Sequence, residues 1–229
     1  MVRSRLMGRG TAAVVILLFL VGGCSRRATD ATAPAAAAVA SGGAPAGGTP
    51  FHVVAGSVPA ARGGMAAIVI LEPRTPREFP PQVEEPFMDQ ISQTFFPAVL
   101  FVRTGQPTEF RNSDDVLHNV RVREQETREG TFNVAIPTGQ VYIHRFPRDG
   151  FYDVGCDIHP GMSAQIVATS TPYAAMADTD GNFVFDDIEP GAYTMVVYVG
   201  ADKIKRTVEV SGARTVVNVT AESAAAAKN

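Results

Sequence analysis

Residues 151–162 read FYDVGCDIHPGM and join an apolar, strand-like run to a short loop that carries three sulfur- or nitrogen-bearing side chains. From Cys156 the spacing is C-x-x-H-x-x-M, which puts His159 and Met162 on the same loop. The Pro-Gly pair between them prevents the loop from continuing as a helix and shapes it. A strand followed by such a loop can present three side chains to one point.

A second histidine lies upstream, in residues 115–120, which read DVLHNV. His118 stands at the edge of another strand-like run, so a neighbouring strand can supply a fourth side chain. The four residues together offer one thiolate, two imidazoles and one thioether. Cu(I) prefers soft sulfur and Cu(II) prefers nitrogen, and two histidines with one cysteine and a long axial methionine suit both states. The combination predicts one mononuclear copper ion that passes single electrons.

Other uses of these residues fit the pattern less well. Zinc is disfavoured because methionine is not a usual zinc ligand and the chain has no second structural cysteine. Covalent haem attachment needs C-x-x-C-H, which is absent. A nucleophilic Cys156 activated by His118 or His159 would leave Met162 without a role. A purely structural cluster of buried Cys, Met and His remains an alternative. We expect no enzymatic activity.

The chain between residues 51 and 220 consists of short apolar runs separated by turn residues. The runs are rich in Val, Ile, Phe and Tyr, several alternate in polarity, and none shows a sustained 3.6-residue period. This pattern predicts an all-β fold built from sandwiches. Only residues 88–94 allow a short helical turn. The main runs are Met65–Leu71, Ala98–Val102, Val116–Val122, Gln140–Phe146, Phe151–Val154, Ala164–Thr169, Asn182–Phe185, Tyr193–Tyr198, Thr207–Val210 and Thr215–Val219.

Residues 85–170 resemble the cupredoxin family of blue copper proteins, such as plastocyanin, amicyanin and pseudoazurin. The stretch FRNSD at residues 110–114, followed by His-Asn-Val, looks like the strand and loop that bear the first histidine ligand of the family. The C-x-x-H-P-x-M loop has the short spacing seen in amicyanin. The resemblance implies a Greek-key β-sandwich with copper ligands His118, Cys156, His159 and Met162.

The same resemblance implies roles for two further features. Asn119 would tie the His118 loop to the Cys156 loop, and His159 would be the partly exposed ligand through which electrons leave. Two residues depart from the family. Gly155 stands where many relatives have a bulkier residue, and Asp157 puts a negative charge beside the thiolate. Both leave the ligand set intact and bear on the reduction potential. Of the remaining histidines, His144 reads as a surface residue of an alternating strand and His52 receives no role.

Residues 173–198 look like a different module. The segment DTDGNF followed by PGAY resembles the carboxypeptidase-regulatory-like, transthyretin-like β-sandwich. The resemblance implies a smaller, discontinuous sandwich formed by residues 51–75 and 171–220, with the cupredoxin-like region between its two parts. Asp178-Thr-Asp180-Gly181 reads as a tight hairpin turn and not as a calcium-binding EF-hand loop.

The N-terminal region reads as an export signal. Residues 1–23 combine three arginines with an uncharged apolar run and small residues that lead into Cys24. This arrangement resembles a bacterial lipobox, which implies lipidation of Cys24, a periplasm-facing protein and an outer membrane rather than an inner membrane site. Residues 24–50, rich in Ala, Gly and Pro, are expected to form a flexible linker. Residues 221–229 read as a tail without an anchor.

Charge narrows the choice of partner. Loss of residues 1–23 removes three arginines and moves the formal net charge from −3 to −6. A mildly acidic protein argues against nucleic acid as a partner and is compatible with a basic redox protein. We therefore expect a type 1 copper protein that carries single electrons in the bacterial cell envelope. The alternatives are an envelope copper-delivery protein and an interaction module without metal.

Overall fold

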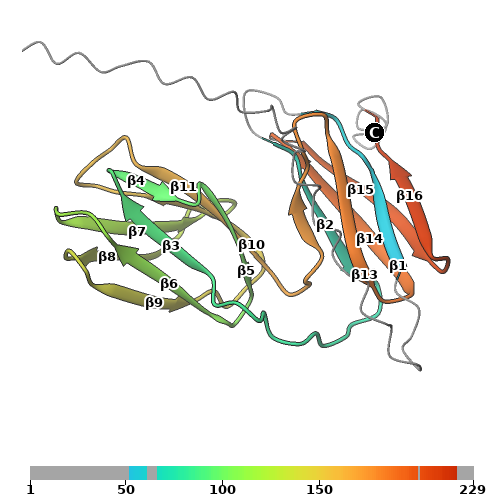
Figure 1. The fold of residues 1–229 in the computed structure, drawn as a ribbon, viewed down its shortest axis with the longest axis horizontal. Helices are drawn as coiled ribbons and strands as arrows, with labels where there is room; N and C mark the ends of the chain where they lie inside the picture. Colours follow the sequence, from blue (N-terminus) through green and yellow to red (C-terminus); the bar gives the residue numbers. More distant parts are fainter. Residues whose placement is uncertain (1–51, 61–65, 201, 221–229) are drawn as a thin grey trace, which may run out of the picture. The chain divides into compact units, whose positions relative to one another are not determined.

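The computed structural model describes residues 52–60, 66–200 and 202–220, and these residues form β-strands joined by turns and loops, without a helix (Figure 1). The prediction of an all-β fold is confirmed. The predicted signal peptide, Cys24, the linker and the tail lie outside the described residues. Across the described part of the chain, no helix is long and apolar enough to cross a membrane.

The central region, residues 87–169, forms two sheets that we call the first sandwich. One sheet has the strand order β4-β3-β6-β9 and the other β5-β11-β10-β7-β8. Buried apolar side chains from both sheets, such as Met88, Phe110 and Ile166, form one hydrophobic cluster between them. The strands are β3 (Phe87–Ile91), β4 (Thr94–Phe96), β5 (Val99–Arg103), β6 (Pro107–Asn112), β7 (His118–Glu124), β8 (Gly130–Ile136), β9 (Val141–Arg145), β10 (Gly150–Gly155) and β11 (Ser163–Thr169).

The remaining strands form two further sheets, which we call the second sandwich. Their strand orders are β13-β1-β16 and β12-β2-β14-β15. Strand β1 pairs with β13 and β16, and β2 pairs with β12 and β14, so strands that precede the first sandwich pair with strands that follow it. The strands are β1 (His52–Ser57), β2 (Ile68–Pro73), β12 (Ala174–Met176), β13 (Asn182–Ile188), β14 (Gly191–Val199), β15 (Asp202–Val210) and β16 (Arg214–Asn218).

The helical turn considered for residues 88–94 is wrong. This segment is a hairpin in which β3 pairs with β4. Ser92 and Gln93 at its turn have φ values of 52° and 54°. Positive φ at both central residues is the geometry that matches the twist of two antiparallel strands, although glycine or asparagine usually supplies it. Because neither residue type stands here, the sequence pattern does not reveal the hairpin.

Asp178 forms the tight turn expected before β13. Its Oδ1 accepts hydrogen bonds from the backbone N–H groups of Asp180, at 3.0 Å, and Asn182, at 2.7 Å. Gly181 has a φ of +87° and packs so closely that a Cβ there would lie 2.1 Å from the carbonyl oxygen of Val58. The Asp178 carboxylate is therefore used to hold the turn.

The variant Gly181→Ala is expected to destabilise the protein by about 2–4 kcal/mol, because it combines a left-handed backbone with a clash against a backbone oxygen. Gly139 has a similar φ of +71°, but a Cβ at this position would have no atom within 4 Å. Gly139→Ala should therefore cost only about 1 kcal/mol. Urea denaturation of both variants measures the difference in their free energies of unfolding. Equal losses of stability would show that the close approach to the Val58 carbonyl oxygen is unimportant.

Candidate metal centre

Two adjacent strands bring the candidate ligands to one end of the first sandwich. Strand β7 begins at His118, and β10 ends at Gly155, immediately before Cys156. The strands are antiparallel neighbours, so the start of β7 lies beside the end of β10. His118 shares the inward face of β7 with Val120 and Val122, because side chains on a strand alternate between its faces. Strand β7 therefore supplies His118, and the loop that joins β10 to β11 supplies Cys156, His159 and Met162. The four predicted ligands thus come from two separate segments of the sequence.

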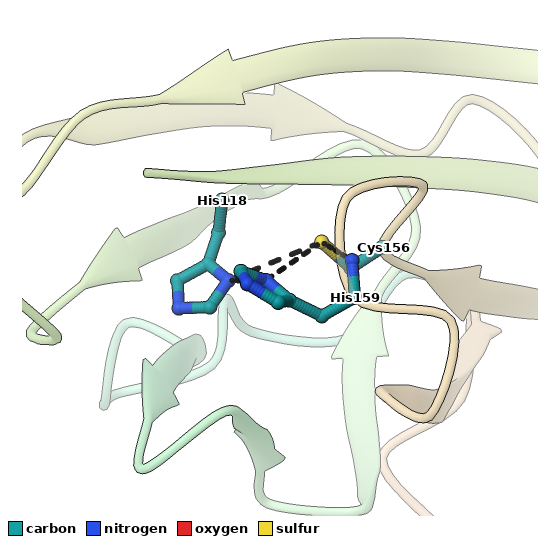
Figure 2. A group of neighbouring side chains, drawn as sticks. All are labelled: His118, Cys156 and His159. Atoms are coloured by element: carbon teal, nitrogen blue, oxygen red, sulfur yellow. Dashed lines mark hydrogen bonds between the residues drawn. The ribbon is translucent and has the colours of Figure 1, made fainter. Parts of the chain in front are cut away.

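His118, Cys156 and His159 form a group whose donor atoms lie within 4.8 Å of one another (Figure 2). The Cys156 Sγ lies 3.9 Å from Nδ1 of His118 and 3.9 Å from Nδ1 of His159, and the two Nδ1 atoms are 2.9 Å apart. His118 is fully buried and Cys156 is 2% exposed, whereas His159 is partly exposed. One soft thiol and two imidazole nitrogens that face a common point fit a copper ion.

Met162, the fourth predicted ligand, is buried at the end of the same loop. It belongs to the hydrophobic cluster that also contains Cys156. Its backbone N–H donates to the carbonyl oxygen of His159 at 3.0 Å, and its carbonyl oxygen accepts from the backbone N–H of Cys156 at 3.4 Å. These bonds close the loop on itself and fix its backbone around Cys156 and His159.

Asp114 belongs to the candidate site, although the sequence pattern does not reveal its contact with His118. Its Oδ2 lies 2.8 Å from Nε2 of His118. A carboxylate can only accept, so Nε2 of His118 carries the proton and its Nδ1 presents a lone pair toward Cys156 and His159. The backbone N–H groups of Ser92 and Gln93 donate to the same carboxylate. Metal-binding histidines commonly have such a partner, which fixes the ring and makes it a stronger donor.

The hydrogen bonds to Asp114 also fix its charge. Burial tends to raise the pKa of this carboxyl, but the hydrogen bonds from Gln93, His118 and Ser92 together lower the pKa below its usual value. The group therefore stays ionised at neutral pH, which is the state that can accept from His118. In the sequence, nothing distinguishes Asp114 from its neighbour Asp115. In the structure, the turn between β3 and β4 donates hydrogen bonds to the Asp114 carboxylate.

Asn119 joins the two ligand-bearing segments. Its Oδ1 accepts hydrogen bonds from the backbone N–H groups of Asp157, at 2.7 Å, and Ile158, at 3.3 Å. The same atom lies 3.3 Å from the Sγ of Cys156. The side chain thus holds the start of the ligand loop against the start of β7, which is the role that the cupredoxin resemblance implied.

We expect Asn119→Ala to lower the stability of the metal-free protein by about 2 kcal/mol, because two partly buried hydrogen bonds from backbone N–H groups lose their acceptor. Asn133→Ala is a matched control, since Asn133 donates to the Asp157 carboxylate but holds no backbone N–H of the loop. Urea denaturation should show a loss at least twice as large for Asn119→Ala. A smaller loss than for the control would mean that Asn119 does not hold the loop.

The two departures from the cupredoxin pattern belong to one polar network. The Asp157 carboxylate accepts from Nδ2 of Asn133 at 2.8 Å and from Nδ2 of Asn119 at 3.2 Å, and it forms an ion pair with Arg121. A Cβ at Gly155 would lie 2.8 Å from Nη2 of Arg121. Glycine at this position therefore leaves space for the guanidinium that neutralises Asp157.

The other two histidines, His144 and His52, contact parts of the fold other than the candidate metal centre. The prediction that His144 lies on the surface is wrong: its ring packs between Phe132 and Phe146, with centroids 4.6 and 4.9 Å away. Its Nε2 is buried without a hydrogen-bond partner, and burial lowers the pKa of His144, which favours the neutral ring. His52 is buried, with its Nδ1 2.7 Å from the carbonyl oxygen of Gly212.

Comparison with known proteins gives matches to parts of the chain. Residues 149–227 match the family described as polysaccharide lyase family 4, domain II. This match begins at the start of β10 and runs through the later strands of the second sandwich. It covers roughly a third of the 229 residues. No curated protein matches the chain.

Several solved structures of copper proteins are similar to part of the chain. Amicyanin from Paracoccus versutus is 16% identical, and the match covers 44% of this chain and 97% of that chain with a TM-score of 0.35. A purple cupredoxin from Nitrosopumilus maritimus is 20% identical over 37% of this chain and 100% of that chain, with a TM-score of 0.34. A copper-containing nitrite reductase from Thermus scotoductus is 24% identical over 44% of this chain and 26% of that chain, with a TM-score of 0.35. At these low scores, the assignment of the metal rests on the donor atoms themselves.

Proposed function

We propose that this protein is a type 1 copper protein that carries single electrons. The observation that supports the proposal is the convergence of the His118, Cys156 and His159 donor atoms at a largely buried point, with the His118 proton held on the far side of its ring by Asp114. Met162, buried on the same loop, would hold the metal through its thioether sulfur. A bound copper ion would supply a one-electron couple, Cu(II)/Cu(I), that both sulfur and nitrogen donors can support.

The residues around the donors favour fast electron exchange. Burial of His118 and Cys156 keeps water away from the thiolate. Asn119, Asp114 and the Met162 backbone hold the donors in place before metal binds. A site that is already arranged needs little rearrangement when its charge changes by one, so the barrier to transfer is small.

Electrons would pass on the exposed side of the site. His159 is the ligand that reaches the surface, and exposed apolar side chains stand next to the ligands in the sequence: Leu117 is 49% exposed and Ile158 is 46% exposed. We propose a redox protein as partner. One electron would enter from a reduced partner and one would leave to an oxidised partner, with no atom or group transferred and no substrate converted.

We also propose where the protein works. The lipobox-like sequence before Cys24 supports an N-terminal lipid anchor, and residues 24–50 support a flexible tether. Together they favour a periplasm-facing protein of the bacterial cell envelope, held more readily at the outer membrane than at the inner membrane. A mildly acidic chain favours a protein partner over nucleic acid.

A copper titration separates the carrier from a delivery protein. Adding Cu(II) to the purified protein should load one copper per chain, and an intense thiolate-to-copper absorption band should appear in the visible range. The band should persist during an incubation with a chelator that strips exposed copper sites, because Cys156 is 2% exposed. Colourless copper that the chelator removes rapidly would indicate delivery instead, and no copper uptake would leave an interaction module.

A further inference from the structure

Two opposite charges form an ion pair at the start of the loop that begins with Cys156. The Asp157 carboxylate follows the cysteine directly, and the Arg121 guanidinium forms an ion pair with it. The side chains of Arg121 and Asp157 are 36% and 42% exposed, so water weakens this pair without removing its field. Neither side chain is a candidate ligand, and the function proposed above gives neither of them a role.

The sheet places Arg121 for this contact. Arg121 stands directly opposite Asn133 on β8 and directly opposite Gly155 on β10, so the three residues form one row across the sheet. Gly155 has no side chain, and the guanidinium occupies the space that a Cβ would take, 2.8 Å from the Cβ position. The row therefore directs Arg121 across β10 toward Asp157, while Asn133 donates to the same carboxylate.

The charges have opposite effects on a copper site. A negative charge near the metal stabilises the more positive Cu(II) state and lowers the reduction potential. A positive charge stabilises Cu(I) and raises it. Asp157 alone would add to the negative charge of the thiolate. Arg121 offsets that effect and, with Asn119 and Asn133, holds the carboxylate toward β7 and β8.

We propose that Arg121 and Asp157 act as a counter-charge pair that sets the reduction potential of the Cys156 site, with Arg121 as a positioning residue for the ligand loop. This inference rests on the proposed copper site. It gives a physical reason for the two residues that depart from the cupredoxin pattern, since Gly155 makes room for the charge that Asp157 requires.

The test is a comparison of four proteins loaded with copper: the wild type, Arg121→Gln, Asp157→Asn and the double variant. Arg121→Gln should lower the reduction potential, and Asp157→Asn should raise it. Each change should shift the equilibrium constant for electron exchange with a reference couple about three- to tenfold, or about 30–60 mV. The double variant should return toward the wild-type value, because both charges are gone.

The directions of the two shifts in reduction potential distinguish an effect of charge from an effect of loop structure. If the pair only held the loop, each single variant would break it, and both potentials would move in the same direction; that result would overturn the proposal. Arg123→Gln is the matched control, because it removes the same charge from the same face of β7 two residues farther along, opposite Asp153. Its shift should be less than half that of Arg121→Gln, and an equal shift would also contradict the proposal.

Urea denaturation of the metal-free variants checks that each protein folds before its potential is read. If Arg121→Gln fails to fold, Asp157→Asn and the Arg123→Gln control still give the sign and the distance dependence. Copper uptake by the wild type tests the proposed copper site separately from the counter-charge pair. A wild type that binds no copper would overturn the proposed function, whereas copper binding with unchanged potentials in both single variants would overturn only the counter-charge pair.

Discussion

Replacing Cys156 with serine is expected to abolish the visible thiolate-to-copper band completely and to weaken copper binding by at least about 100-fold. The band requires a sulfur–copper bond, and a neutral hydroxyl is a poor ligand for Cu(I). The metal-free protein should keep its fold, because a hydroxyl can still bond to the neighbours of the thiol, Asn119 Oδ1 and the His159 N–H. Visible absorption and a competition assay with a copper-binding dye measure the two effects.

The chain provides its own control for this experiment. Cys24 is the only other cysteine in the sequence, and Cys24→Ser should leave the band and the copper affinity unchanged. A band that survives in Cys156→Ser, or disappears in Cys24→Ser, would remove Cys156 from the ligand set. Circular dichroism of both variants shows whether either change has disturbed the strands.

The second large effect is expected from Asp114→Asn. The Asp114 carboxylate accepts a hydrogen bond from the Nε2–H group of His118, and its replacement by a neutral amide weakens the donor strength of Nδ1 and the preference for one ring orientation. Losing such a partner commonly costs about 10–100-fold in metal affinity. Competition for Cu(II) with a chelator of known affinity measures the change.

Asp115→Asn is the matched control, since Asp115 is adjacent, carries the same charge and is exposed. It should leave the copper affinity within about twofold of the wild type. Equal losses in both variants would mean that general charge near His118, and not the Asp114 hydrogen bond, controls affinity. Unchanged affinity in Asp114→Asn would remove Asp114 from the metal centre.

The candidate ligands could be predicted from sequence because three of them are local. The spacing of Cys156, His159 and Met162 fixes them on one loop, and the apolar run before that loop identifies a strand. His118 required only that a second strand lie beside the first, which antiparallel pairing of β7 with β10 provides. The four residues also carry rare donor chemistry, so their combination is informative in a chain with two cysteines.

Apart from Asn119, whose role the cupredoxin resemblance implied, the residues that support the candidate ligands could not be predicted in the same way. Arg121 contacts Asp157 because of the register between β7 and β10, and Asn133 joins them because of the register between β7 and β8. Asp114 reaches His118 from a position that the hairpin between β3 and β4 holds. Such contacts depend on strand pairings that no local pattern in the sequence specifies.

His144 shows why alternation alone misleads. In β9 the apolar residues Val141 and Ile143 face solvent, 51% and 57% exposed, while His144 turns toward Phe132 and Phe146. At Val141, Ile143 and His144, the polarity of the side chain is therefore the reverse of its burial. A histidine ring can pack against aromatic rings as a flat, partly apolar group, so its polar class does not decide which face of the strand it occupies.

A redox titration of the copper-loaded wild type is the direct test of single-electron transfer at this site. We expect the visible band to bleach with one electron per chain, to return on oxidation with one electron, and to repeat over several cycles without loss of copper. A site built by His118, Cys156, His159 and Met162 for electron transfer must show this behaviour. A chain that binds one copper but releases it on reduction, or that shows no thiolate band in the oxidised state, would contradict a role in electron transfer.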